Sequence, residues 1–192
     1  MMNKEQILEV AAQIIRKKGF HATSMQDIAD AVNLQKASLY HHISSKQEIL
    51  LALLDRALDM LTERLQSVTE QDLPAEEKFR LAVRTFLSAL NEHHDLVSVL
   101  LLEHRSLEPE YHTRHIVRRD RFEKLWRDLI QEGMDSGKFT RSDPALTARA
   151  LLGVMNWTVT WYRPSGPLGM STISDHLSDL FLNGLLVRPV VD

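Results

Sequence analysis

The segment KASLYHH, residues 36–42, concentrates hydrogen-bond donors and flat rings in one short stretch of the chain. In a helix over this segment, Leu39 and Ile43 face inward, so the polar residues are left on the outer side. These outer residues are Lys36, Ser38, Tyr40, His41 and His42. Ammonium and hydroxyl groups on such a face donate hydrogen bonds to phosphate oxygens and to base edges in a DNA groove. The segment therefore favours nucleic-acid binding.

A second short helix is predicted immediately before this segment. Apolar residues recur at helical spacing in MQDIADAV, and Thr23 or Ser24 is placed to cap the start of the helix. Asn33 stands at the turn between the two helices, where a short amide side chain tolerates a positive φ. The stretch from residue 25 to residue 43 thus predicts a helix-turn-helix, a motif whose second helix lies in the DNA major groove.

An αα-corner in an ordinary helical protein would have the same apolar spacing. Two features favour DNA binding over that alternative. The outer face carries donors and rings rather than Glu/Lys pairs, and the segment SSKQE follows it directly. Ser45 and Glu48 form a predicted capping box, and Lys46 stands in the first turn, where its charge opposes the helix dipole. We interpret Lys46 as a phosphate contact that acts with the free amides of the helix start.

Roughly the first sixty residues resemble the N-terminal domain of TetR-family transcriptional repressors. The resemblance is carried by AAQIIRKKGFHATSMQDIADAVNLQKASLYHHISSKQEIL, within which GF, TS, DIA, SLYHH and SKQE are its specific motifs. Asn33 replaces the usual glycine of the turn, and Ala37 and Ile43 replace a common glycine and phenylalanine. These departures keep a permitted turn residue and an apolar contact, so they are compatible with the fold.

The resemblance implies a role for each residue of the DNA-binding face. DNA phosphates would be held by Tyr40 and Lys46, and by a hydroxyl group at Thr23 or Ser24. Phosphates or base edges would be reached by Lys36, Ser38, His41 and His42. The resemblance leaves open which bases are contacted.

The charge of the chain is divided unevenly, in agreement with a DNA-binding N-terminus. The net charge is −3, but residues 1–46 carry +2 and the remainder carries −5. The chain has no cysteine, which excludes disulfides, thiolate zinc sites and cysteine nucleophiles. No apolar run reaches transmembrane length and no signal-peptide pattern begins the chain, so we expect a cytoplasmic protein without a membrane partner.

Helical periodicity continues to the end of the chain, and no segment predicts a strand. We expect an all-α fold of nine helices in two domains, similar to the TetR family in layout. Residues 1–48 would form a three-helix DNA-binding domain, and residues 49–192 a ligand-binding and dimerisation domain. The segment NEHHD is expected to separate the fifth helix from an apolar sixth helix over residues 96–102. A long helix from Ser45 would belong to both domains, so a tilt in one domain would move the other.

Two helices of the C-terminal domain offer a candidate ligand site. The first, in EYHTRHIVRRDRFEKLWRDLI, combines an arginine stripe with aromatic residues, and the second ends in NWTVTWYRPSGPL, which resembles TetR-type regulators that respond to acyl-CoA thioesters. An aromatic pocket rimmed by arginine would suit an acyl chain and the phosphates of CoA. The candidate residues are Arg114, Arg118, Arg121, Phe122, Trp126, Trp157 and Trp161. The alternatives are an ion-paired surface stripe for the arginines and a dimer core for the tryptophans.

Metal-binding and enzymatic functions have weaker support. His112 and His115 are spaced by three residues, but no HExxH motif accompanies them, so we predict neither a metal nor a cofactor. The sequence has no GxSxG, Walker loop or GxGxxG to nominate a catalytic residue. A helical enzyme or scaffold would show no salt-dependent retention on DNA, which distinguishes these classes from a DNA-binding protein.

The sequence thus predicts a homodimeric transcriptional repressor that leaves double-stranded operator DNA when a small apolar effector binds. We expect the effector to be an acyl-CoA thioester; the alternative is a TetR-type regulator of a multidrug or xenobiotic efflux gene. One short recognition helix gives too small an interface for specific binding, so two-fold pairing on a palindrome is expected. The last two helices are expected to pair through Leu151, Leu152, Met155, Leu177, Phe181 and Leu185.

Overall fold

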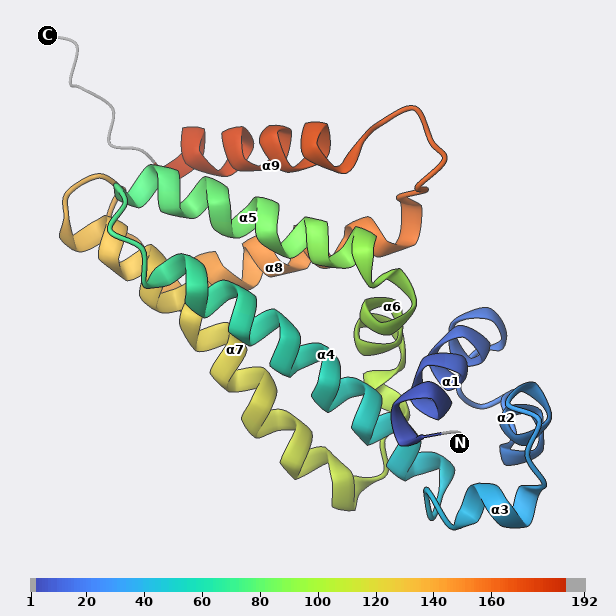
Figure 1. Cartoon of the computed structure of the whole chain (residues 1–192). Coiled ribbons are helices and arrows are strands. Elements are labelled where there is room, and N and C mark those ends of the chain that lie inside the picture. The colour runs from blue at the N-terminus through green and yellow to red at the C-terminus, as the bar shows by residue number, and fades with distance from the viewer. Residues whose placement is uncertain (1–2, 186–192) are drawn as a thin grey trace, which may run out of the picture. The chain divides into compact units, whose positions relative to one another are not determined.

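A computed structural model describes residues 3–185 of the chain, together with all side chains in that range except Leu185. This part is built from nine α-helices and one 3-10 turn (Figure 1). The elements are α1 (Lys4–Lys18), α2 (Met25–Ala31), α3 (Lys36–Tyr40), α4 (Lys46–Thr69), α5 (Ala75–Glu92), α6 (His94–Glu103), η1 (His104–Ser106), α7 (Pro109–Asp135), α8 (Pro144–Trp161) and α9 (Met170–Leu185). The prediction of an all-α, nine-helix fold is confirmed. No helix among the described residues is long and apolar enough to cross a membrane.

The described residues pack as two compact units, and two of the helices have residues in both units. The first unit consists of the residues up to Met60 together with His93–Arg119, and the second of Leu61–Glu92 together with the residues from Asp120 onward. The long helices α4 and α7 each contribute to both units. The predicted domain boundary after residue 48 follows the sequence motif and stays a prediction.

In the first unit, α1 is fixed at both ends by local chemistry. The side chain of Asn3 accepts a hydrogen bond from the backbone N–H of Gln6, and the side chain of Gln6 accepts one from Asn3, which completes a capping box. Gly19 ends the helix with a φ of +83°. Helix α6 packs against α1, and Arg16 forms an ion pair with Asp95 of α6.

The junction of α5 and α6 differs from the prediction. The segment NEHHD does not form a loop, because α5 runs to Glu92 and α6 begins at His94. Only His93, with φ −118° and ψ 44°, departs from helical geometry between them. The polar composition of the segment reflects its partial exposure rather than a break in the helical backbone.

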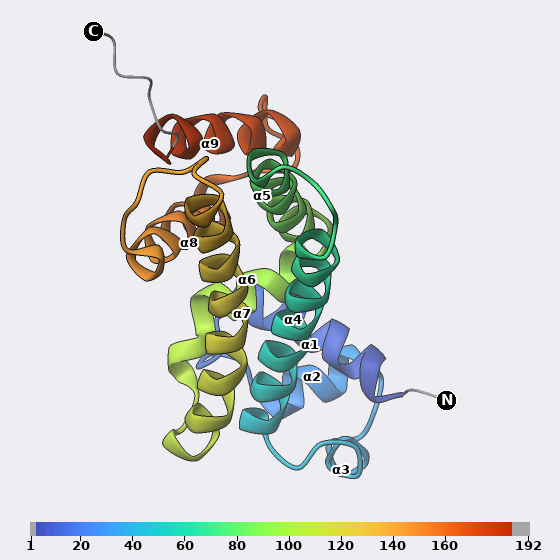
Figure 2. The ribbon, with the colours of Figure 1, turned by 90° about the vertical axis from the view of Figure 1, so that its left-hand side faces the viewer.

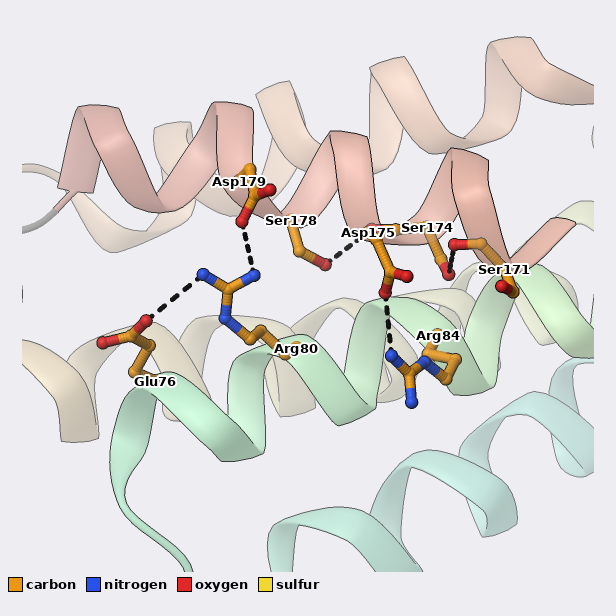
Figure 3. Close-up of polar contacts among 8 residues, drawn as sticks. All are labelled: Glu76, Arg80, Arg84, Ser171, Ser174, Asp175, Ser178 and Asp179. Atoms are coloured by element: carbon orange, nitrogen blue, oxygen red, sulfur yellow. Dashed lines mark hydrogen bonds and ion pairs between the residues drawn. The ribbon is translucent and has the colours of Figure 1, made fainter. Parts of the chain in front are cut away.

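In the second unit, α9 lies along α5 (Figures 1 and 3). Ile173, Leu177 and Leu182 of α9 are buried, as are Ser174 and Ser178. The serine hydroxyls donate to carbonyls of their own helix, so small polar residues enter this contact without an unpaired donor. At the edge of the contact, Arg80 and Arg84 of α5 pair with Asp179 and Asp175 of α9, at 2.6 and 2.8 Å.

The exposed apolar surface of α8 and α9 differs from the predicted dimer surface. Leu151, Met155 and Leu177 are buried within their own chain, so their assignment to a dimer contact is wrong. Leu152 and Phe181 are half-buried and stay predictions, and the side chain of Leu185 lies outside the described residues. The large apolar residues that remain exposed on these helices are Leu146, Val154, Trp157, Trp161 and Leu180. Because α8 is apolar on several sides, its sequence pattern does not reveal which side packs inward.

Candidate nucleic-acid interface and ligand site

The predicted helix-turn-helix is formed by α2 and α3, which lie beside each other in both views (Figures 1 and 2). Ser24 caps α2, and its hydroxyl accepts a hydrogen bond from the backbone N–H of Asp27 at 3.1 Å. Hydrogen bonds from Lys18 and Ser24 hold the pKa of Asp27 well below its ordinary value, so this cap stays ionised. Asn33 adopts a φ of +54° in the turn, as its short amide permits.

The polar residues of α3 and of the turn that follows it are mostly exposed. Leu39 and Ile43 are buried, which leaves Lys36, Tyr40, His41 and His42 exposed and Ser38 half-buried. The helix is shorter than expected, because it ends at Tyr40. The backbone N–H groups of His41 and His42 donate to the carbonyls of Ser38 and Leu39, which is the spacing of a 3-10 turn. We refer to five of the residues predicted for DNA contact, Lys36, Ser38 and Tyr40 of α3 and His41 and His42 of the turn after it, as the α3 face.

The other predicted phosphate contacts all form hydrogen bonds within the chain: Thr23 is buried, Lys46 is half-buried and Ser24 is exposed. Thr23 is 1% exposed, and its hydroxyl donates to the carbonyl of Gly19 at 2.8 Å. The hydroxyl of Ser24 donates to the carboxylate of Asp27 at 2.6 Å. The Nζ of Lys46 donates to the carbonyls of Phe20 and Thr23 at 2.9 and 2.7 Å.

The start of α4 is capped almost as predicted. The hydroxyl of Ser45 accepts from the backbone N–H of Glu48 at 3.0 Å, while the carboxylate of Glu48 accepts from the N–H of Ser44 rather than that of Ser45. The bond from Ser44 lowers the pKa of Glu48. These bonds occupy amides at the helix start.

Two of the three predicted effector arginines lie in an ion-pair cluster in the first unit. Arg118 contacts Asp55 at 3.1 Å and also pairs with Asp59, and Arg114 contacts Asp55 at 3.4 Å. Asp55 is 8% exposed; burial raises its pKa, while the two arginines act in the opposite direction. Arg121 is exposed. Any anionic ligand of Arg114 or Arg118 must therefore compete with these carboxylates.

The aromatic candidates Phe122 and Trp126 line a small cavity in the second unit. Its wall is formed by side chains of α4, α5 and α7, namely Leu61, Arg64, Leu65, Ala82, Thr85, Phe86, Phe122 and Trp126. The ring of Phe86 stacks on Phe122 and meets Trp126 edge-on, with centroids 6.1 and 6.4 Å apart. The cavity holds about one water molecule. The Nε1 of Trp126 has no hydrogen-bond partner among the described residues.

The remaining aromatic candidates are not part of this cavity. Trp157 and Trp161 are 66% and 46% exposed and lie on the outer side of α8. The sequence did not nominate Arg64 and Phe86, although both line the cavity. The helical spacing of apolar residues in the fifth helix marked Phe86 as a core position. No pattern placed Arg64 beside a cavity, because a charged residue that pairs with Glu92 at 2.8 Å is typical of a helix surface.

Comparison with protein families identifies the two halves of the chain separately. Residues 7–53 match the model described as bacterial regulatory proteins, tetR family, and residues 72–185 match the tetracyclin repressor-like C-terminal domain. The chain belongs to the TetR family. It is a TetR-type transcriptional repressor with a DNA-binding helix-turn-helix, which confirms the prediction of a regulator rather than an enzyme.

Several TetR-family relatives match nearly the whole chain. The HTH-type transcriptional repressor KstR2 of Mycobacterium tuberculosis is 29% identical over 182 residues, covering 94% of this chain and 91% of KstR2. The structure of the TetR regulator PfmR from Thermus thermophilus has a TM-score of 0.86 and 36% identity, and covers 93% of this chain and 97% of PfmR. The structure of AibR with isovaleryl coenzyme A and operator DNA has a TM-score of 0.83 and 28% identity, over 95% of this chain and 97% of AibR.

Two substitutions on the α3 face are expected to separate base contacts from phosphate contacts. Lys36→Ala should cost about 1–3 kcal/mol on the preferred operator and relax selection at one or two base pairs. Tyr40→Phe should instead weaken binding to all duplexes by about fivefold, the value of one hydrogen bond. Selecting operators from a random duplex library measures the change of preference, and titration of the preferred operator and of an unrelated duplex measures the uniform loss of affinity.

The matched control is Lys124→Ala, which removes the same charge from an exposed position of α7. It should leave both affinity and sequence preference unchanged. If Lys36→Ala keeps the operator preference of the wild type, Lys36 does not contact a base.

Proposed function

We propose that this repressor binds a palindromic operator as a homodimer in the cytoplasm and blocks transcription by occlusion. The α3 face carries the proposal, because α3 and the turn after it present five potential DNA contacts and are anchored by buried Leu39 and Ile43. A single five-residue helix makes a small interface, which favours two copies on two half-sites about one helical turn apart. The exposed apolar residues of α8 and α9 supply a surface for self-association. A monomer in light scattering at micromolar concentration would contradict this assembly.

We assign the DNA contacts as follows. Lys36, Ser38, His41 and His42 are the proposed contacts to base edges or phosphates. Tyr40 and Lys46 are proposed phosphate contacts, and the ammonium of Lys46 would exchange its bonds to backbone carbonyls for a phosphate. Ser24 is exposed and close in sequence to the α3 face, but its hydroxyl is engaged with Asp27, so a phosphate contact requires it to exchange partners. Thr23 is buried by its bond to Gly19 and supports the turn that precedes α2.

We propose an acyl-CoA thioester as the effector that releases the operator. AibR, which resembles this chain over nearly its whole length, forms a complex with isovaleryl coenzyme A. Phe122 and Trp126 provide an apolar, aromatic wall for an acyl group. Arg121 belongs to the same unit as Phe122 and Trp126 and offers a guanidinium group for a phosphate. Arg114 and Arg118 stay candidates from the sequence alone, and both form ion pairs with acidic residues of the first unit. Trp157 and Trp161 would take part only if their exposed face closes over the ligand.

The effector must also shift the repressor between two states. The cavity in the second unit is too small for an acyl chain, so occupation requires α5 to separate from α4 or α7. A ligand releases DNA only to the extent that it binds the released state more tightly than the DNA-bound state. Helix α4 begins next to the helix-turn-helix and also lines the cavity, so its displacement is the proposed route of transmission.

A thermal-shift panel tests the identity of the effector. The panel contains acyl-CoAs of increasing chain length, the matching free acids, CoA alone and hydrophobic drugs. An acyl-CoA at a hundred times its Kd should add about 2.7 kcal/mol of stability and release operator DNA at the same concentration. If free acids stabilise the protein and release DNA as well as the acyl-CoAs do, the arginines do not bind the effector. Action by drugs alone would favour the efflux-regulator alternative, while the DNA-binding function would be unaffected.

A further inference from the structure

The indole of Trp126 is a buried hydrogen-bond donor without an acceptor. Trp126 lies on α7 and is 0% exposed, and its Nε1 has no hydrogen-bond partner among the described residues. Buried tryptophan N–H groups usually find an acceptor, because an unpaired donor keeps the cost of its lost hydration. A phenylalanine would supply an aromatic ring at this position without that cost. Packing alone therefore does not account for the N–H group.

Two neighbouring rings pack edge-on against the indole. Its centroid lies 6.4 Å from that of Phe86 and 6.5 Å from that of Phe122, at interplanar angles of 77° and 85°. Both rings line the same cavity as Trp126. Since a buried side chain packed between two rings has little rotational freedom, the N–H group is held in place before a ligand binds. A donor that is fixed in advance loses little entropy on binding.

The other polar side chains of the cavity can also donate hydrogen bonds. Trp126 shares the lining with Arg64 and Thr85, and the remaining lining residues are aliphatic or aromatic. A guanidinium group only donates, and a hydroxyl group can donate. None of the described side chains that line the cavity is acidic, so the lining offers no partner to a ligand ammonium. The lining thus matches an apolar ligand that is neutral or anionic and carries an acceptor oxygen.

We propose that Trp126 is a specificity-determining residue of the effector site, and that its Nε1 donates a hydrogen bond to a carbonyl oxygen of the effector. The space for about one water molecule in the cavity matches such an oxygen, while the apolar body of the ligand enters as the helices separate. A ligand of the same shape without the carbonyl leaves the donor unpaired and binds more weakly. The inference rests on the proposed function for the location of the effector site, but it does not require coenzyme A.

Two pairs of probes, whose members differ only by a carbonyl in place of a methylene group, test this hydrogen bond. The pairs are hexanoyl-CoA with S-hexyl-CoA, and acetophenone with ethylbenzene. In the wild type, the carbonyl member of a pair should bind about tenfold more tightly than the methylene member. It should also move the indole N–H signal of Trp126 downfield in NMR spectra, whereas the methylene member should not. The signal is assigned by its loss in Trp126→Phe.

Two replacements of Trp126 should abolish the tenfold preference within each pair. Trp126→Phe keeps an aromatic ring but leaves space where the larger ring was. Benzothienylalanine in place of Trp126 keeps the shape of the indole and has sulfur instead of the N–H group. The preference is a ratio measured within one variant, so a general loss of affinity cancels.

A preference that survives both replacements overturns the proposal. So does the absence of a carbonyl-dependent shift of the Trp126 signal with both pairs of probes. If acetophenone shows the shift and the preference while hexanoyl-CoA does not bind, the acyl-CoA effector of the proposed function is wrong and the role of Trp126 stands.

Discussion

Replacing Gly133 with alanine is expected to lower the free energy of unfolding by about 3 kcal/mol and Tm by about 6–12 °C. A Cβ at this position would lie 2.1 Å from a ring carbon of Phe139. The ring is 1% exposed and meets Phe79 edge-on at 5.9 Å, so it has no space into which to move. The backbone N–H groups of Lys138 and Phe139 both donate to the carbonyl of Gly133, which fixes the ring above α7. The side chain and the end of α7 must therefore shift together.

Gly153→Ala is the matched control, since it makes the same change within α8. A Cβ there meets no atom within 4 Å, so the substitution should stabilise the helix by up to about 1 kcal/mol. Urea unfolding of both variants at equal protein concentration gives the comparison. Equal effects for the two variants would contradict the close approach of Phe139 to α7.

Acidification from pH 6.5 to pH 4 is expected to remove about 3 kcal/mol of stability through His115. Burial lowers the pKa of His115 to about 4, and the positive charges of His104, Arg119 and His112 add to the effect. Its ring is 2% exposed and stacks on His104 with centroids 6.4 Å apart. Between pH 6.5, the ordinary pKa of the histidine in the unfolded chain, and its pKa of about 4 in the folded chain, His115 is protonated in the unfolded chain and neutral in the folded one. The contribution is therefore fully present above pH 6.5 and is lost as the pH falls towards 4.

The pH effect is measured by urea unfolding of the wild type and His115→Phe at half-unit intervals of pH. The phenylalanine keeps an aromatic ring and cannot titrate, so the variant should lose most of the slope between pH 6.5 and pH 4. Some slope remains, because burial also lowers the pKa of His104 and His94. His176→Gln, at an exposed position of α9, should follow the wild type. Parallel curves for the wild type and His115→Phe would contradict the assignment.

The parts of the site that the sequence predicted are those fixed by local chemistry. Ser24 caps α2 and Asn33 takes a positive φ, and both follow from neighbours within four residues. The backbone acceptors of the Lys46 ammonium were beyond such reasoning, because they lie 23 and 26 residues earlier in the chain. The sequence could show that its charge opposed the dipole of α4, but not which acceptors compensated it.

Contacts between helices account for the other differences. No sequence pattern predicts that the Phe139 ring packs on Gly133, because the chain reverses at Gly137 to bring the ring back onto the end of α7. Trp157 and Trp161 were grouped with Phe122 and Trp126 because all are aromatic, yet the first pair is exposed and the second buried. The inward side of an almost wholly apolar helix is set by its neighbours, which periodicity alone does not identify.

The closed cavity beside Phe86, Phe122 and Trp126 has a consequence for the dose at which an effector acting there would switch the regulated genes. Such an effector binds only those molecules whose helices have already separated or separate on binding. Its apparent Kd is the intrinsic Kd divided by the fraction of molecules in the open form. For an effector of this kind, tight aromatic packing would set a concentration threshold, so that basal amounts would leave the genes repressed and accumulation would release them. Looser packing in the core around this cavity would lower that threshold without altering a contact to DNA.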